Sequence, residues 1–90
     1  MLNTKDRNGT TVEVGTKVRV LKISESIFTR LSDDEAVRVR SMEGESFAVY
    51  EIDEWGGAWV EKWWSLDVGE SISHSLGLEA SEMEVIVDSR

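Results

Sequence analysis

The chain has 90 residues, among them 10 basic and 18 acidic side chains, which give a formal net charge of -8. This length is enough for one domain, spanning residues 1–90, whose single core leaves no room for a deep enclosed catalytic pocket. The sequence has no cysteine, which excludes disulfides and thiolate chemistry. It also has no long apolar run, so we expect no signal peptide, no membrane span and a cytoplasmic location.

The first predicted elements are turns and a half-buried strand. The Asn-Gly pair at residues 8–9 is typical of a tight turn. After a second turn at residues 15–16, apolar and charged residues alternate, as in a strand with one face in the core. The expected inward-facing residues are Val18 and Val20 with Leu21 or Ile23, and the expected outward-facing residues are Lys17 and Arg19.

The segment 24–44 is expected to contain a short helix. Ser32 and Glu35 match the capping box, and the acidic residues around them suit the positive end of the helix dipole. Apolar residues follow at helical spacing, and Gly44 can end the helix. Residues 36–40 also alternate as a strand would, but the cap and the glycine favour the helix.

A β-hairpin is predicted in the middle of the chain. Residues 46–53 form its first strand and residues 58–64 its second. The turn falls at residues 54–57, where a Gly-Gly pair tolerates the backbone angles of a tight hairpin. The turn and the second strand hold all four tryptophans of the chain: Trp55, Trp59, Trp63 and Trp64. These rings either fill the core or form a recognition surface.

The remaining residues predict two more strands. A turn at residues 67–70 leads into a weaker, polar strand over residues 71–76. A single helical or 3₁₀ turn at residues 78–83 precedes a closing strand at residues 84–88. Five short strands, with a 3₁₀ turn before the last, are the organisation of an SH3-like barrel, so the predicted fold is mainly β with a short helix between strands 1 and 2.

Four stretches carry a resemblance that agrees with this fold. Residues 14–20 resemble the first strand of KOW and related SH3-like barrel domains, and residues 79–87 are similar to their closing turn and strand. Together with residues 42–53 and 73–78, they make the chain resemble a small group of uncharacterised bacterial SH3-like barrel proteins. The resemblance implies that the first and last strands pair. It also implies that the protein has an accessory or binding role, and it does not imply a particular activity. It would place Lys17 and Arg19 opposite Glu84 and Asp88.

The charge is distributed unevenly. Residues 1–42 carry eight basic and six acidic side chains, whereas residues 43–90 carry two basic and twelve acidic ones. Nucleic-acid binding depends on clustered Lys and Arg, which this chain lacks, and an anionic membrane surface is disfavoured for the same reason. We therefore expect no nucleic acid and no membrane as partner. A basic protein is the electrostatically favourable partner, although acidity also simply keeps a small domain soluble.

His74 is the candidate for chemistry, because it is the single histidine. It could act as a general base or a metal ligand, but only carboxylates could complete a zinc site, and no nucleophile elbow surrounds a serine. A strand-borne histidine that hydrogen-bonds a neighbour is the simpler interpretation. The acidic run 33–35 is explained by helix capping. We expect no metal, no cofactor and no enzymatic activity.

The tryptophans are the candidate binding site. Alternation along the second hairpin strand puts Ala58, Val60 and Trp64 on one face, with Trp59, Glu61 and Trp63 on the other. Burying the first set exposes the second, unless residues 24–44 fold over these rings. Tryptophan is enriched at interface hot spots. The predicted binding patch is Tyr50, Trp55, Trp59 and Trp63.

These expectations favour a non-enzymatic protein-binding or accessory module, present as a monomer or weak homodimer. The first alternative is a KOW-like nucleic-acid or ribosome-associated factor. Its basic residues would be Lys17, Arg19, Arg38 and Arg40. The second alternative is a small enzyme that uses His74.

Overall fold

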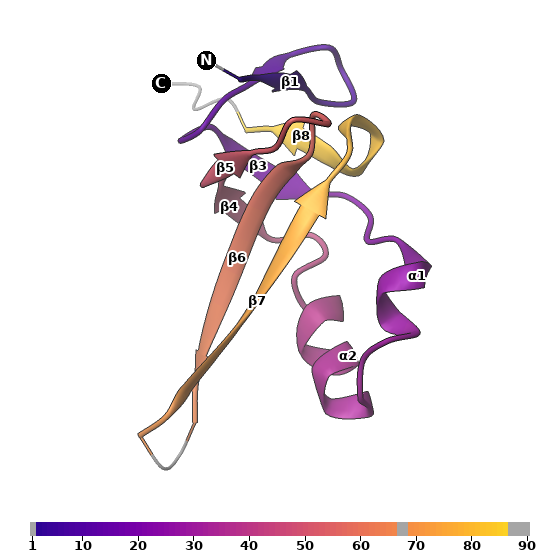
Figure 1. Cartoon of the computed structure of the whole chain (residues 1–90), viewed down its shortest axis with the longest axis vertical. Coiled ribbons are helices and arrows are strands. Elements are labelled where there is room, and N and C mark those ends of the chain that lie inside the picture. Colours follow the sequence, from indigo (N-terminus) through magenta and orange to yellow (C-terminus); the bar gives the residue numbers. More distant parts are fainter. Residues whose placement is uncertain (1, 67–68, 87–90) are drawn as a thin grey trace.

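The computed structural model describes residues 2–66 and 69–86, and within them the protein is mainly β (Figure 1). The strands form three sheets, with orders β1-β2, β4-β3-β8 and β5-β6-β7. The strands are β1 (Thr4–Lys5), β2 (Thr11–Val12), β3 (Lys17–Val20), β4 (Ser46–Ala48), β5 (Glu51–Ile52), β6 (Ala58–Ser65), β7 (Ser71–Leu78) and β8 (Met83–Val85). The helices are α1 (Glu25–Phe28), α2 (Asp33–Arg40) and the 3₁₀ helix Ala80–Glu82.

The predicted β character and the helix between the first two predicted strands are confirmed, but the barrel is not. The described residues contain eight strands rather than five, and their three sheets do not close on one another. The closing strand was predicted at residues 84–88. It is found at Met83–Val85, and residues 87–88 lie outside the described residues. No described helix has the length and apolar character needed to cross a membrane.

Strand β3 confirms the alternation read from the sequence. Val18 and Val20 are fully buried, while Lys17 and Arg19 are exposed. The predicted pairing of first and last strands is also present, because β3 lies antiparallel to β8 with Arg19 opposite Glu84. Their side chains approach to 3.9 Å at the surface, where an ion pair contributes little stability.

The predicted capping box is confirmed, and the strand alternative for residues 36–40 is wrong. Glu35 N–H donates to Ser32 Oγ at 3.3 Å, and Ser32 N–H donates to Glu35 Oε1 at 3.2 Å. Helix α2 ends at Arg40, and Gly44, with φ +89°, completes the turn that follows. Residues 36–40 fit the helical and the strand periodicity equally well. The capping box favours the helix, because it supplies acceptors for backbone N–H groups at the start of a helix.

The strand predicted over residues 46–53 is divided between two sheets. Val49 N–H donates to Thr16 O at 2.9 Å, on the β3 side, whereas Tyr50 N–H donates to Trp59 O at 2.9 Å, on the β6 side. Trp59 already has Glu51 as its strand partner, so two residues oppose one. This is a β-bulge, which bends the chain and moves it from one sheet to the other.

The hairpin of β6 and β7 is the longest feature of the molecule, and the two helices lie beside its inner face (Figure 1). Its two strands pair over eight residues each, and β7 extends two residues beyond the predicted strand. The core lies where the root of this hairpin meets β3, β8 and α2. Its apolar members are Val12, Val18, Val20, Ile23, Val39, Met42, Val49, Ile52, Ala58, Val60, Leu76, Leu78 and Met83.

A small hairpin at the start of the chain, β1 and β2, is fixed to the last strand by a buried aspartate. Asp6 is 3 % exposed. Its Oδ1 accepts the N–H groups of Asn8 and Thr10, both at 2.8 Å, and its Oδ2 accepts Val85 N–H at 2.7 Å. Burial alone would raise the pKa of Asp6, but these donors outweigh burial, and the pKa lies below its ordinary value.

Candidate binding surface

The outer face of the β6–β7 hairpin carries two of the predicted tryptophans. Trp59 and Trp63 alternate with the buried Val60, as the sequence predicts, and Trp63 is 62 % exposed. Their partners on β7 are small, since Trp59 lies opposite Gly77 and Trp63 opposite Ser73. Large rings on one strand therefore stand beside a strand without bulk, where Trp63 is exposed and Trp59 is half-buried.

The indole of Trp59 is held in one orientation. Its Nε1–H donates to Asp53 Oδ2 at 2.9 Å. The ring lies over Gly77, because a Cβ added at that residue would come within 2.9 Å of Trp59 Cζ2. The ring therefore packs against the backbone of β7. A glycine below and a carboxylate at its edge fix the indole before any partner arrives, which lowers the entropic cost of binding.

Asp53 also fixes the turn that presents Trp55. Its Oδ1 accepts Trp55 N–H at 2.9 Å and Gly57 N–H at 2.7 Å, and Gly56 adopts φ +84°. The Trp59 indole donor, followed by the backbone donor of Gly57, lowers the pKa of Asp53. The carboxylate is therefore charged at neutral pH, and Trp55 projects from the turn with 84 % of its surface exposed.

Trp55 and Trp59 line one hollow of about 650 Å³. It is also lined by Ser75 and Gly77 of β7 and by Ile27 of α1, which packs against the core. Asp53, Glu79 and Ala80 lie at its rim along with the turn glycines. Its size and apolar walls suit a few side chains of a partner rather than an enclosed substrate.

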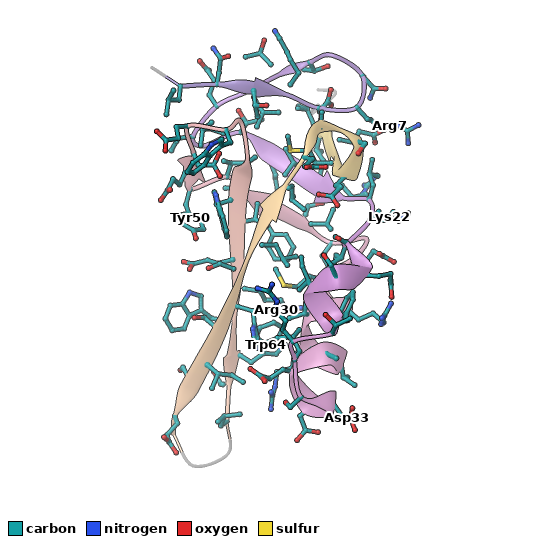
Figure 2. The ribbon with its side chains drawn as sticks, turned by 45° about the vertical axis from the view of Figure 1, so that its right-hand side comes forward. Arg7, Lys22, Arg30, Asp33, Tyr50 and Trp64 are labelled. Atoms are coloured by element: carbon teal, nitrogen blue, oxygen red, sulfur yellow. The ribbon has the colours of Figure 1, made fainter. Side chains whose placement is uncertain are left out.

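Tyr50 does not join this hollow. It is 44 % exposed and lines a second hollow of about 360 Å³, together with Leu2, Val14 and Ile52. Figure 2 shows Tyr50 on the side of the hairpin away from the helices, as the outer face is, so Tyr50 differs from Trp55 and Trp59 only in the hollow that it lines. The structure therefore brings Trp55 and Trp59 together, places Trp63 further along the same face, and separates Tyr50.

Carboxylates surround the tryptophan face. Glu51 is the strand partner of Trp59, and Glu61 lies between Trp59 and Trp63 on the same face of β6. Glu54 in the turn and Glu79 at the rim of the hollow are exposed as well. The field at this face is therefore negative, and it attracts basic groups.

The fourth tryptophan, Trp64, lies on the inner face, between the hairpin and the helices (Figure 2). The His74 ring meets it edge-on, with ring centroids 5.7 Å apart and an interplanar angle of 73°. The ammonium group of Lys62, opposite His74, stands 5.4 Å from the Trp64 ring centroid and pairs with Glu45. His74 is thus placed among packing partners rather than beside a nucleophile.

The other candidate residues for chemistry do not assemble. Within residues 2–66 and 69–86, no three His, Asp or Glu side chains come together in a way that could hold a metal ion. Of the basic residues considered for nucleic acid, Arg19 pairs with Glu84. Arg40 lies 3.6 Å from Glu25, with its guanidinium 4.0 Å from the Phe28 ring centroid.

Sequence reasoning missed the two residues that position Trp59. The sequence patterns above place Asp53 at the end of a strand and include Gly77 only in the stretch 73–78, without a role for either side chain or position in orienting Trp59. A signal for Asp53 exists, because residues 6–9 and 53–56 share an aspartate followed three positions later by a glycine. Such spacing is typical of a turn in which the aspartate accepts backbone N–H groups. For Gly77 the signal is pairing register, which the sequence alone does not specify.

Compared with models of known protein families, with curated proteins and with solved structures, the chain matches none.

Proposed function

We propose that this protein is a non-enzymatic module that binds a basic partner protein through the outer face of the β6–β7 hairpin. Trp55, Trp59 and Trp63 are the contact residues, and Tyr50 lies outside the surface. The observation that carries the proposal is the fixed Trp59 indole beside a hollow that Trp55 also lines. Trp59 is half-buried and fixed, and Trp55 beside it is exposed. Tryptophan is enriched at interface hot spots.

The charge of the surface defines the partner. Glu51, Glu54, Glu61 and Glu79 lie on or around the tryptophan face. Indole faces attract Lys and Arg through cation–π contact, and nearby carboxylates add ionic attraction. A partner segment rich in Lys or Arg satisfies both requirements. We expect a cytoplasmic protein that acts as a monomer or weak homodimer and does not bind membranes.

An SH3-like arrangement is part of this proposal. Its support is the pairing of β3 with β8, the 3₁₀ helix before β8, and the bulge at Tyr50 that passes the chain between sheets. In this interpretation the two three-stranded sheets are an opened form of the barrel. Peptide recognition through aromatic surfaces is common among SH3 domains, which agrees with the proposed role by analogy of fold.

Peptide selection tests the proposal. The immobilised protein is exposed to a displayed random library of peptides of about 12 residues, long enough to span an eight-residue strand. We expect enrichment in Lys and Arg, and a loss of affinity of about 30-fold in Trp59→Ala. Val37→Ala is the matched control, because Val37 is a 70 % exposed apolar residue on α2, away from this face. Peptides without basic residues, or binding that survives Trp59→Ala, would contradict the proposal.

A further inference from the structure

The free edge of β7 is long, regular and uncharged. β7 is the last strand of its sheet and pairs with β6 through eight consecutive residues without a bulge. Its sequence contains no Lys, Arg, Asp, Glu or Pro. Edge strands are usually protected from further pairing by short length, charge, proline or bulges. β7 has none of these protections, so its edge is open to another strand.

The register identifies which backbone groups point outward. Leu66 N–H donates to Glu70 O at 2.7 Å across the hairpin, which makes this pair a hydrogen-bonded one. Hydrogen-bonded and non-bonded pairs alternate in antiparallel strands, so Ile72, His74, Leu76 and Leu78 direct their backbone groups to β6. The residues that direct N–H and C=O groups to the open edge are Ser71, Ser73, Ser75 and Gly77. Outside the ladder, no hydrogen bond joins those groups to another described residue.

The hollow described above runs along this open edge. Ser75 and Gly77 line it from β7, Trp55 and Trp59 line it from the outer face, and Ile27 lines it from the side of the core. Two walls with a strand edge between them form a slot. Strands in a sheet lie about 4.8 Å apart, so the slot holds one extended segment bonded to β7.

The occupant follows from charge and from shape. A second copy of the chain would bring a two-stranded hairpin into a slot between Ile27 and Trp59, and it would bring a second net charge of -8. A single extended segment of a basic protein meets neither obstacle. Its alternate side chains would face Trp55 and Trp59, with Asp53 and Glu79 at the rim of the same hollow.

We infer that the partner binds by strand addition: an extended, basic segment pairs with the open edge of β7 in the slot between Trp59 and Ile27. Backbone hydrogen bonds to Ser71, Ser73, Ser75 and Gly77 supply affinity, and the tryptophan face selects alternate side chains. This binding mode rests on the proposed function, and it specifies how the same site recognises its partner.

Hydrogen exchange of single amides tests the binding mode. The probe is the tightest peptide from the selection described above, added to the ¹⁵N-labelled protein. In the free protein, the amides of Ile72, His74 and Leu76 should exchange slowly and those of Ser73, Ser75 and Gly77 fast. With the peptide bound, the fast set should become slow as well, because each gains a hydrogen-bond acceptor.

Two backbone substitutions provide an independent test. Ser75→Pro removes an N–H that points to the open edge, where proline is tolerated, and should weaken peptide binding by about tenfold. Ser75→Ala keeps the N–H and loses only the hydroxyl, so it should weaken binding less than Ser75→Pro does, and Val37→Ala, outside this surface, should bind like the wild type. N-methylation of the peptide at successive residues needs no protein variant, and should weaken binding at every second position only.

The outcomes separate this inference from the proposed function. If a peptide shifts the Trp59 indole resonance but leaves Ser73, Ser75 and Gly77 fast, strand addition is wrong and the tryptophan site stands. If no library peptide binds, both are wrong. If those amides become slow without peptide as the protein concentration rises, the edge pairs with a second copy, and a partner segment is not its occupant.

Discussion

Two turns of this molecule share one local design and serve different purposes. One begins at Asp6 and the other at Asp53, and each has a glycine three residues later, with φ +79° at Gly9 and +84° at Gly56. In both turns the Oδ1 atom accepts the N–H groups two and four residues along. They differ in Oδ2, which accepts Val85 N–H in the first turn and the Trp59 indole in the second.

The second oxygen therefore decides what each turn does. Asp6 is buried, and its hydrogen bond from Val85 ties the first hairpin to β8, while its other two hydrogen bonds close the turn itself. Asp53 is partly exposed and orients a side chain of the candidate site. A motif that is identical at the level of the backbone becomes structural or functional through one further contact.

The largest expected effect comes from breaking the first turn. Asp6→Ala leaves three backbone N–H groups without their acceptor, one of them on β8, and should lower the free energy of unfolding by about 3 kcal/mol. Urea unfolding followed by tryptophan fluorescence measures it. Asp6→Asn keeps one acceptor oxygen and should cost less. A loss no larger for Asp6→Ala than for Asp53→Ala would contradict the division between the two turns.

The two faces of β6 show the same division between residues that stabilise the fold and residues of the candidate site. Val60 is fully buried, so Val60→Ala should cost about 2 kcal/mol. Trp63→Ala removes a far larger but mostly exposed side chain and should cost less than about 1 kcal/mol. Equilibrium unfolding of both variants gives the comparison.

Acrylamide should quench Trp55 and Trp63 in the native protein. If all four indoles resist acrylamide, the outer face is covered, and no exposed tryptophan surface exists.

Gly77→Ala tests whether the Trp59 indole, which Asp53 of the second turn also holds, packs against β7. The new Cβ would contact the Trp59 ring at 2.9 Å, so the indole must leave its position over the strand. We expect a loss of about 1 kcal/mol in stability, together with a shift of the Trp59 indole resonance. Ser75→Ala, two residues away on the same strand, should change neither. An unchanged indole resonance in Gly77→Ala would mean that the ring is not held against β7.

The pH dependence of stability tests the role of the Asp6 carboxylate in the first turn. The pKa of Asp6 in the folded protein lies below its ordinary value of 3.8, so its stabilising contribution is present above that pH. The contribution is lost as the pH falls through the folded pKa, because protonation weakens the accepted hydrogen bonds. Unfolding free energies measured from pH 6 downward should fall less steeply in Asp6→Asn than in the wild type. Parallel curves would show that Asp6 is not the group involved.

The smallest effect on stability is expected at Asp53. Asp53→Asn keeps the turn through its remaining oxygen but loses the charge-assisted bond to the Trp59 indole. Stability should change less than in Asp6→Asn, whereas affinity for a selected basic peptide should fall. The pair of titrations, Asp53→Asn against Asp6→Asn, measures the separation of site from fold. Equal loss of peptide affinity in both variants would contradict it.

Local patterns predicted the elements whose causes are local. The capping box of Ser32 and Glu35 marked the start of α2, and alternation placed Val60 inside and Trp63 outside. The sequence could not show the bulge at Tyr50, because it depends on which strand each neighbour meets. For that reason the closed five-stranded barrel is not present, and Tyr50 lines a different hollow from Trp55 and Trp59.

The site was predictable to the same extent. The period of two predicted that Trp59 and Trp63 share the outer face of β6, and the Gly-Gly pair predicted the turn that holds Trp55. The orientation of Trp59 was not predicted, since it depends on Asp53 and on Gly77, which is brought beneath the ring by pairing 18 positions away in the chain. Contacts of this kind follow from strand register, which residue composition alone leaves open.

The hydrogen bond from Val85 to Asp6 joins residues 79 positions apart, and this separation bears on how fast the protein folds. Folding slows as contacts become more distant in sequence, because a long loop must close before such a contact forms. The acceptor at Asp6 is synthesised first, and its donor on β8 follows 79 residues later. On the ribosome, residues 4–12 therefore gain their contact with β8 only after residue 85 has emerged.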